Sequence, residues 1–282
     1  MINVENLKFT YPQGDAQTLK GLNFEIKEGE IFGFLGPSGA GKSTAQKILY
    51  KLLTGYEGKV LIDGKDLNSW DKSYFEKIGV GFELPNHYMK LTGRENLKLF
   101  ASFYSKACLP VEQLFEMVEL SEAMDKKVEE YSKGMKMRLN FIRAIQHQAD
   151  ILFFDEPTSG LDPVNALKIK QHILDLKKQG KTIFVTTHSM ETADQICDRV
   201  AFLVDGEIKA CDPPNKLKSL YGQEAVRVEL IDGKQEVFEL KNIGNNPTFL
   251  DFIQSTEVKK MNSLDASLEE VFMQVTGKAL RQ

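Results

Sequence analysis

A glycine-rich stretch near the beginning of the chain has the residue types and spacing of a phosphate-binding loop. Residues 36–44 read GPSGAGKST and match the pattern G-x-x-x-x-G-K-[ST] in full. The three glycines allow the backbone to bend so that successive N–H groups converge on an anion, and the helix expected next adds its positive end. Lys42 supplies a positive charge to the β- and γ-phosphates, and the Ser43 hydroxyl is a ligand for Mg²⁺. The loop therefore predicts a site for a nucleotide with Mg²⁺.

Two adjacent carboxylates are the second candidate for chemistry. Residues 151–163 read ILFFDEPTSGLDP, so an apolar strand delivers Asp155 and Glu156 at its end. Neighbouring strand positions point to opposite faces, so the two side chains have different roles unless the strand has ended. The consistent division places Asp155 on Mg²⁺, directly or through water, and Glu156 beside the water that attacks the phosphate.

Buried strands are expected to position these groups. Residues 31–35 and 151–154 are continuous apolar runs, which are typical of strands buried on both faces. Residues 182–186, with the apolar run 183–185, predict another buried strand. The segment 164–178 between the last two predicts a helix. Strand, helix and strand at this spacing imply parallel pairing through a right-handed crossover.

Helices and hairpins are expected around these strands. Apolar spacing after the phosphate loop predicts a helix that continues through Leu53 and stops at Gly55. Residues 92–147 are predicted to be helical, with a capping box formed by Thr92 and Glu95 and a later helix capped by Ser132.

Alternating apolar residues predict further strands at residues 7–11 and 22–26, and Asp63-Gly64 and Asp205-Gly206 are typical of hairpin turns.

The last part of the chain has a different composition. After Gly222, alternation at residues 226–230, a turn at Asp232-Gly233 and a helix capped by Ser267 predict a small α+β annex. Its ~60 residues are near the lower limit for a self-sufficient core.

Composition excludes several classes of protein. The chain has 282 residues, 42% hydrophobic and 27% charged, with a net charge of −4, so we expect no nucleic-acid partner. None of its apolar runs approaches the ~20 residues of a membrane-spanning helix, and the first residues do not resemble a signal peptide. The three dispersed cysteines predict neither a disulfide framework nor a metal pair.

In these segments the chain resembles the ATP-binding subunits of ABC transporters, over about residues 1–220. Residues 36–44 match the Walker A motif and residues 151–156 match Walker B with its catalytic Glu. Residues 159–162, SGLD, match the D-loop, and His188 matches the switch histidine. Residues 131–135, YSKGM, stand where the family has LSGGQ.

The resemblance implies the fold. It implies an α/β P-loop NTPase of the ABC ATPase type, with a mixed core sheet like that of RecA, an antiparallel β subdomain and a helical subdomain. We expect the ATPase domain at 1–220, its helical subdomain at about 84–147, and a C-terminal accessory α+β domain at 221–282.

The resemblance also implies the site. It makes Glu156, His188 and Lys42 catalytic. It places Mg²⁺ on Ser43, Asp155 and Glu83. The positions that match the family's ATP contacts are Tyr11, Gly36, Pro37, Ser38, Gly39, Ala40, Gly41, Lys42, Ser43, Thr44, Glu83, Ser132, Gly134 and Asp162.

Three residues depart from the family pattern. Glu83 stands at the glutamine position of the Q-loop, Lys133 replaces a glycine, and Met135 replaces the glutamine of LSGGQ. These variants, with the LTGREN helix start at residues 91–96, look like the exporter branch called ABC-2 type.

The function implied is ATP hydrolysis coupled to export. ATP bound to the loop of one subunit is capped by residues 132–135 of a second, forming a homo- or heterodimer, and a separate polytopic membrane subunit carries the substrate. The expected location is the cytoplasmic face of the cell membrane. The alternatives are an importer subunit, which Glu83 and YSKGM disfavour, and a non-transport ABC ATPase. A P-loop kinase would lack YSKGM and SGLD.

Overall fold

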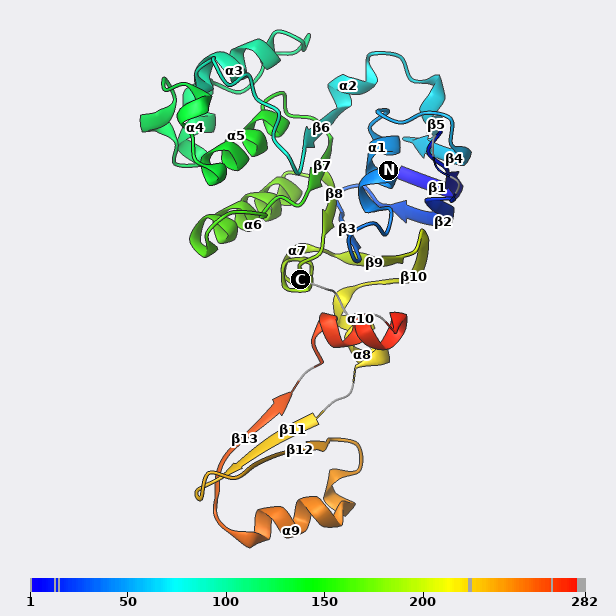
Figure 1. The fold of residues 1–282 in the computed structure, drawn as a ribbon, viewed down its shortest axis with the longest axis vertical. Helices are drawn as coiled ribbons and strands as arrows, with labels where there is room; N and C mark the ends of the chain where they lie inside the picture. The colour runs from blue at the N-terminus through cyan, green and yellow to red at the C-terminus, as the bar shows by residue number, and fades with distance from the viewer. Residues whose placement is uncertain (1, 13, 15, 223–224, 265, 278–282) are drawn as a thin grey trace. The chain divides into compact units, whose positions relative to one another are not determined.

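The computed structural model describes residues 2–12, 14, 16–222, 225–264 and 266–277 (Figure 1). The chain divides into two compact units, Met1–Cys211 and Asp212–Gln282. Each unit has its own sheet and its own helices.

A six-stranded sheet is the centre of the first unit. Its strand order is β10-β9-β3-β8-β7-β6, and the pairs β9–β3, β3–β8, β8–β7 and β7–β6 are parallel. The strands are β3 (Ile31–Leu35), β6 (Ile78–Gly81), β7 (Ile151–Asp155), β8 (Thr182–Thr187), β9 (Arg199–Val204) and β10 (Glu207–Asp212). Every residue of β3, β7 and β8 is buried, so the predicted apolar runs are confirmed as central strands.

A second, antiparallel sheet has the order β2-β1-β4-β5. Its strands are β1 (Ile2–Phe9), β2 (Leu19–Ile26), β4 (Glu57–Ile62) and β5 (Lys65–Asp66). One apolar core joins both sheets. In it Phe34 packs edge-on against Phe24 and Phe184, at 4.9 and 5.0 Å between ring centroids. The predicted Asp63-Gly64 turn joins β4 and β5, with positive φ at both residues.

The helices of the first unit form two sets. One set accompanies the sheets: α1 (Lys42–Leu49), α2 (Tyr74–Lys77), α6 (Pro163–Lys178) and α7 (Met190–Ile196). The other forms a separate helical group in Figure 1: α3 (Gly93–Ala101), α4 (Val111–Met117) and α5 (Lys133–Ile145). The Thr92–Glu95 capping box is confirmed at α3, and the Ser132 side chain accepts a hydrogen bond from the Met135 N–H at the start of α5.

Two local expectations about the first unit differ from the structure. The helix after the phosphate loop ends at Leu49, because the chain turns at Lys51, which has a left-handed φ of 61°. Leu52 is therefore exposed, although its spacing is helical. The strand β6 was not predicted, because its four residues include two glycines and show no clear alternation.

The second unit has a three-stranded antiparallel sheet of order β12-β11-β13. Its elements are α8 (Pro214–Tyr221), β11 (Ala225–Leu230), β12 (Gln235–Glu239), α9 (Pro247–Ser255), β13 (Val258–Leu264) and α10 (Leu268–Thr276). Phe249 of α9 packs with Val226, Val228, Leu230 and Phe238 to form the core. The sequence did not predict α9 or β13. The predicted division after residue 220 falls at the end of α8, which contacts α10.

Among the described residues, no helix has both the length and the apolar character needed to cross a bilayer.

Candidate functional site

Polar residues meet around one cavity of about 440 Å³ in the first unit. They come from the phosphate loop, from the segment before β2, and from the segments that follow β6, β7 and β8. The residues that line it are Tyr11, Thr18, Ser38, Gly39, Gly41, Lys42, Ser43, Thr44, Glu83, Asp155, Glu156 and His188. Since β3, β7 and β8 are parallel, their carboxyl ends meet at the edge of the sheet where ligands bind in such folds.

The glycines of the phosphate loop serve two purposes. Gly39 and Gly41 have φ of 80° and 106°, a left-handed conformation that glycine adopts without strain. Gly36 is required for a different reason, because a Cβ there would lie 2.0 Å from the Leu203 carbonyl oxygen of β9. The loop therefore bends at two residues and packs against the sheet at a third.

Lys42 points into the loop. Its Nζ donates to the carbonyl oxygens of Gly36 and Pro37, at 2.7 and 3.1 Å. Burial lowers the pKa of Lys42, and the negative charges of Glu156, Asp155 and Glu83 act against that lowering. A cation is thus placed among backbone groups at the point where phosphate would bind.

The two adjacent carboxylates point to different partners. β7 ends at Asp155, and Glu156 has a left-handed φ of 49°. This conformation is uncommon for a residue with a Cβ and is here accompanied by several hydrogen bonds to the side chain. Because β7 ends at Asp155, the alternation of side chains along a strand does not determine the direction of the Glu156 side chain.

Asp155 lies beside the phosphate loop. Its Oδ1 is 3.5 Å from Ser43 Oγ and accepts a hydrogen bond from the Thr186 hydroxyl of β8. A carboxylate next to a hydroxyl is an oxygen donor set of the kind that Mg²⁺ prefers when phosphates and waters complete its coordination. Within the described part of the chain, no cluster of three or more His, Cys, Asp or Glu side chains could hold a metal by itself. The residues therefore fit Mg²⁺ bound together with a nucleotide.

Glu156 is held by the end of β8. Its Oε1 accepts from the backbone N–H of His188 at 2.8 Å and lies 2.7 Å from His188 Nδ1, while its Oε2 accepts from the Thr187 hydroxyl at 3.1 Å. Glu156 is 7% exposed, whereas His188 is exposed to solvent. An imidazole that donates through Nδ1 to a carboxylate leaves its Nε2 free for a ligand.

Tyr11 and Glu83 both line this cavity. The Tyr11 hydroxyl lies 3.1 Å from Thr44 Oγ1, and its ring packs edge-on against Phe9. Glu83 is an exposed residue after β6. Both therefore lie in the same cavity as the phosphate loop.

Other predicted residues lie outside this cavity lining. Pro37 and Ala40 form a turn of the loop, with Ala40 N–H donating to the Pro37 carbonyl at 3.2 Å. Asp162 caps α6, accepting from the Val164 and Asn165 N–H groups.

The signature segment lies close to the D-loop. Ser132 is exposed, a Cβ on Gly134 would lie 3.5 Å from Leu161, and the Lys133 side chain lies over Gly160.

Three threonines of the site were not predicted. Thr18 lines the cavity, and Thr186 and Thr187 hold the two carboxylates. A signal was present in the TIFVTT run, because two polar residues end an otherwise apolar strand. Which carboxylate each one meets depends on the register that pairs Asp155 with Thr186.

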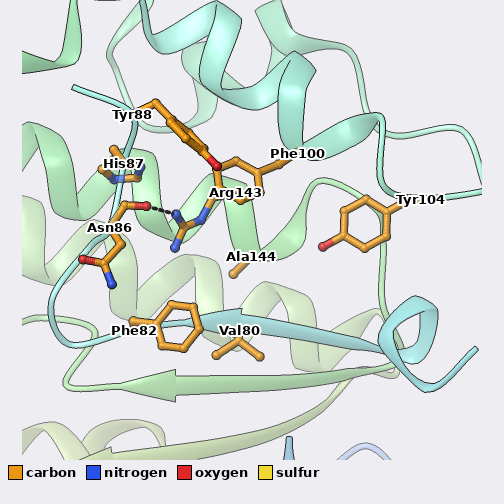
Figure 2. Close-up of a pocket in the computed structure, with 9 residues that line it drawn as sticks. All are labelled: Val80, Phe82, Asn86, His87, Tyr88, Phe100, Tyr104, Arg143 and Ala144. Carbon is orange, nitrogen blue, oxygen red and sulfur yellow. Dashed lines mark hydrogen bonds between the residues drawn. The ribbon is translucent and has the colours of Figure 1, made fainter. Parts of the chain in front are cut away.

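The structure has a second cavity of about 410 Å³ (Figure 2). It is lined by Val80, Phe82, Asn86, His87, Tyr88, Phe100, Tyr104, Arg143 and Ala144. Arg143 is in the centre of this view, with Phe100 and Phe82 on either side. Leu84, Tyr88, Met89 and Phe103 are exposed apolar residues. Tyr88 lines this cavity, and Phe103 packs edge-on against Phe100, which also lines it.

The fold and the first cavity define a P-loop ATPase, because a phosphate loop with its lysine faces two carboxylates at the ends of parallel strands. Residues 19–159 match the family model described as ABC transporter. The chain belongs to the ABC transporter family, as an ATP-binding subunit that hydrolyses ATP.

Individual relatives agree with this assignment. The chain is 48% identical to a fluoroquinolones export ATP-binding protein of Mycobacterium tuberculosis, over 99% of this chain and 94% of that protein. It is 31% identical to a Nod factor export ATP-binding protein of Neorhizobium galegae, over 95% and 83%. The structure of the ATP-binding cassette MJ0796, a dimer in a post-hydrolysis state with ADP and Pi, superposes with a TM-score of 0.69 at 32% identity, over 76% of this chain and 98% of that chain.

Proposed function

We propose that this ATPase drives export through a separate membrane subunit. The observation that carries the proposal is the 48% identity to an export ATP-binding protein over 99% of the chain. That similarity extends past residue 159, where the match to the family model ends, and includes the second unit. The likeness to a protein with an export function therefore covers both parts of the molecule.

Binding of ATP follows from the geometry of the loop. The backbone N–H groups of the loop and the amino-terminal end of α1 would face the phosphates. The Lys42 ammonium group, which donates to the Gly36 carbonyl, would donate to a phosphate oxygen instead. Tyr11, which lines the cavity, would stack on the adenine. Ser43 and Asp155 would hold Mg²⁺, with Glu83 as a third oxygen donor, and the ion would supply positive charge to the phosphates.

Hydrolysis uses the second carboxylate. Glu156 accepts the proton of the attacking water, while Lys42 stabilises the charge that develops on the transferred phosphoryl group. His188 orients Glu156 through Nδ1 and meets the γ-phosphate through Nε2. A buried carboxylate held by three hydrogen bonds keeps its orientation while the water reacts.

A second subunit completes the site in this proposal. Ser132 and Gly134 stand at the start of α5, outside the lining of the cavity, with their backbone N–H groups available to an anion. In a two-fold dimer they cap the ATP of the partner, and Asp162 lies at the start of α6 beside them. Closing the dimer excludes water from the phosphates and assembles the catalytic groups.

The membrane subunit is proposed to dock on the face around Leu84, Tyr88, Met89 and Phe103. Tyr88 lines the cavity in Figure 2, Leu84 follows Glu83 directly in the chain, and Phe103 packs edge-on against Phe100, which also lines that cavity. An apolar surface of this kind fits a protein partner better than lipid headgroups. Docking there locates the chain at the cytoplasmic face of the cell membrane.

Replacement of Glu156 by Gln tests the catalytic proposal. We expect hydrolysis to fall by about 100-fold or more, because the proton acceptor is lost while binding is retained. A stable ATP-bound dimer should then appear by light scattering. Glu191→Gln, at an exposed carboxylate on α7, is the matched control and should hydrolyse ATP normally. Retained turnover in Glu156→Gln contradicts the role assigned to Glu156.

Replacement of Leu84 by Asp tests the docking face. Leu84 is 73% exposed, so the change should leave the fold and basal ATPase activity intact but prevent co-purification with the membrane subunit from native membranes. Leu52→Asp, at a leucine that is 62% exposed elsewhere, is the control. Equal recovery of the membrane subunit with both variants contradicts this docking face.

A further inference from the structure

The segment that carries Glu83 is held by α5, the helix that begins at the signature segment. Residues 82–88 leave β6 and lead toward α3. Glu83 in this segment lines the nucleotide cavity, while its neighbours Phe82, Asn86, His87 and Tyr88 line the second cavity. The position of Glu83 is therefore set by whatever anchors the residues around it.

Two side chains of α5 supply these anchors. The amide of Asn140 donates through Nδ2 to the Phe82 carbonyl, and the Arg143 guanidinium donates to the Asn86 carbonyl, each at 2.7 Å (the second is drawn in Figure 2). The two side chains are also tied to each other, because Arg143 donates to Asn140 Oδ1 at 2.7 Å. One carbonyl on each side of Glu83 is thus held by the same pair.

Burial makes this pair costly to break. Asn140 and Arg143 are only 3% and 6% exposed. The guanidinium lies 4.7 Å from the ring centroid of Phe100 and 5.8 Å from that of Phe82, as expected for a cation held over aromatic faces. Burial lowers the pKa of Arg143 to about 10, so the side chain stays charged at neutral pH. Loss of either partner would leave buried donors or acceptors unpaired.

Further hydrogen bonds hold the segment on the far side of Glu83. Beyond Asn86, His87 Nε2 donates to the Lys136 carbonyl of α5 at 3.0 Å, and Tyr88 exchanges two hydrogen bonds with Asn96 of α3. Glu83 and Leu84, between Phe82 and Asn86, are exposed.

The strand before the segment is also packed on α5. A Cβ on Gly79 would lie 2.0 Å from the Ala144 carbonyl oxygen, so β6 and α5 are in direct backbone contact.

We propose that Asn140 and Arg143 are positioning residues that place Glu83 in the nucleotide cavity from α5. Through them the position of Glu83 depends on the same helix that carries Ser132 and Gly134 at its start. The pair acts on ATP hydrolysis only through Glu83. This inference rests on the proposed contact of Glu83 with Mg²⁺ and ATP, and it adds the residues that make that contact possible.

Hydrogen exchange of the free protein tests the anchoring. Asn140→Leu removes both hydrogen bonds of the amide at similar volume, and we expect faster amide exchange in residues 82–88. Arg143→Lys is the second variant, because an ammonium group cannot reproduce the fork of the guanidinium. Arg138→Lys is the matched control, since Arg138 of α5 donates to the Val118 carbonyl in a different segment. Unchanged exchange in both variants overturns the proposal.

Steady-state hydrolysis tests whether the pair acts through Glu83. We expect Asn140→Leu, Arg143→Lys and Glu83→Ala each to lower kcat/KM about tenfold, mainly by raising KM for Mg·ATP. In the Glu83→Ala background, Asn140→Leu should then have no further effect. Additive losses would show a general structural role and overturn the proposal.

The two arms separate this inference from the function it rests on. If Glu83→Ala hydrolyses ATP like the unaltered protein, the role assigned to Glu83 is wrong, and a positioning role falls with it. If Glu83→Ala is impaired but the α5 variants are not, the role of Glu83 stands and only the present inference is overturned.

Discussion

Asp155 and Glu156 are neighbours in the chain but belong to different parts of the site. Asp155 faces Ser43 and Thr186, whereas Glu156 faces Thr187 and His188. The left-handed backbone at Glu156 turns the second carboxylate away from the first. In the proposed site Asp155 can therefore contact Mg²⁺ while Glu156 contacts the water. Adjacency in the chain alone did not determine this division.

His87 is expected to make the stability of the fold depend on pH. Burial lowers the pKa of His87 to about 4, helped by the charge of Arg143, and its ring bonds to the Lys136 carbonyl. The folded pKa lies below the unfolded value, so the neutral ring stabilises the fold above pH 6.5 and that stability is lost as pH falls toward 4. The loss is at most roughly 3 kcal/mol.

His87→Gln is the variant that measures this effect, because it removes the titrating ring and can keep the donor to Lys136. Thermal unfolding midpoints of the two proteins should be similar at pH 7.5. As the pH is lowered from 6.5 to 4, the midpoint of the unaltered protein should fall more steeply. Parallel curves across this range would contradict the account of His87.

Strand β8 supplies hydrogen bonds to the two adjacent carboxylates of the candidate site. Its last two residues, Thr186 and Thr187, are fully buried, and each donates to one carboxylate of the β7 end. The parallel register that pairs Asp155 with Thr186 brings these groups together. A fully buried strand of the core thus also sets the positions of the two carboxylates.

Thr187→Val should lower kcat by about tenfold, because a hydrogen bond to a charged group that orients Glu156 is lost. Thr187→Ser keeps the hydroxyl and should restore most of the activity. Thr182→Val is the control, since Thr182 lies at the other end of β8, where its hydroxyl accepts from the Gly29 N–H. Steady-state ATPase rates distinguish the four proteins. Equal kcat in Thr187→Val and Thr182→Val would show that Glu156 does not depend on this contact.

In the proposed dimer each ATP site is shared, so the first unit of one chain supplies the phosphate loop of one site and the α5 start of the other. The cavity lining comes from the segment before β2, the phosphate loop and the ends of β6, β7 and β8, while Ser132 lies at the start of α5, outside that lining. Two subunits related by a two-fold axis would bring each loop against the α5 start of the other. Catalysis should therefore depend on association.

Mixing two inactive variants tests this arrangement. Lys42→Ala removes the phosphate contact and Ser132→Arg blocks the cap, so each variant alone should hydrolyse little ATP. A mixed dimer contains one intact site, made from the loop of one chain and the cap of the other. An equimolar mixture should recover roughly a quarter of the normal rate if sites act independently. No recovery in a mixture shown to form mixed dimers would contradict the shared site.

Much of this molecule was determined by local sequence. Apolar runs defined β3, β7 and β8, and side-chain caps defined the starts of α3, α5 and α10, because these features depend on neighbouring residues. The phosphate loop was recognisable from nine consecutive residues for the same reason.

The tertiary structure decided what depends on residues far apart in the chain. Only the approach of β9 shows that Gly36 must lack a side chain, and only strand register assigns Thr186 and Thr187 to different carboxylates. The pairing of Asn140 and Arg143 with the Glu83 segment likewise spans more than fifty residues. Local patterns reflect backbone periodicity and capping, whereas these contacts exist only after packing brings distant segments together, so local sequence patterns do not predict them.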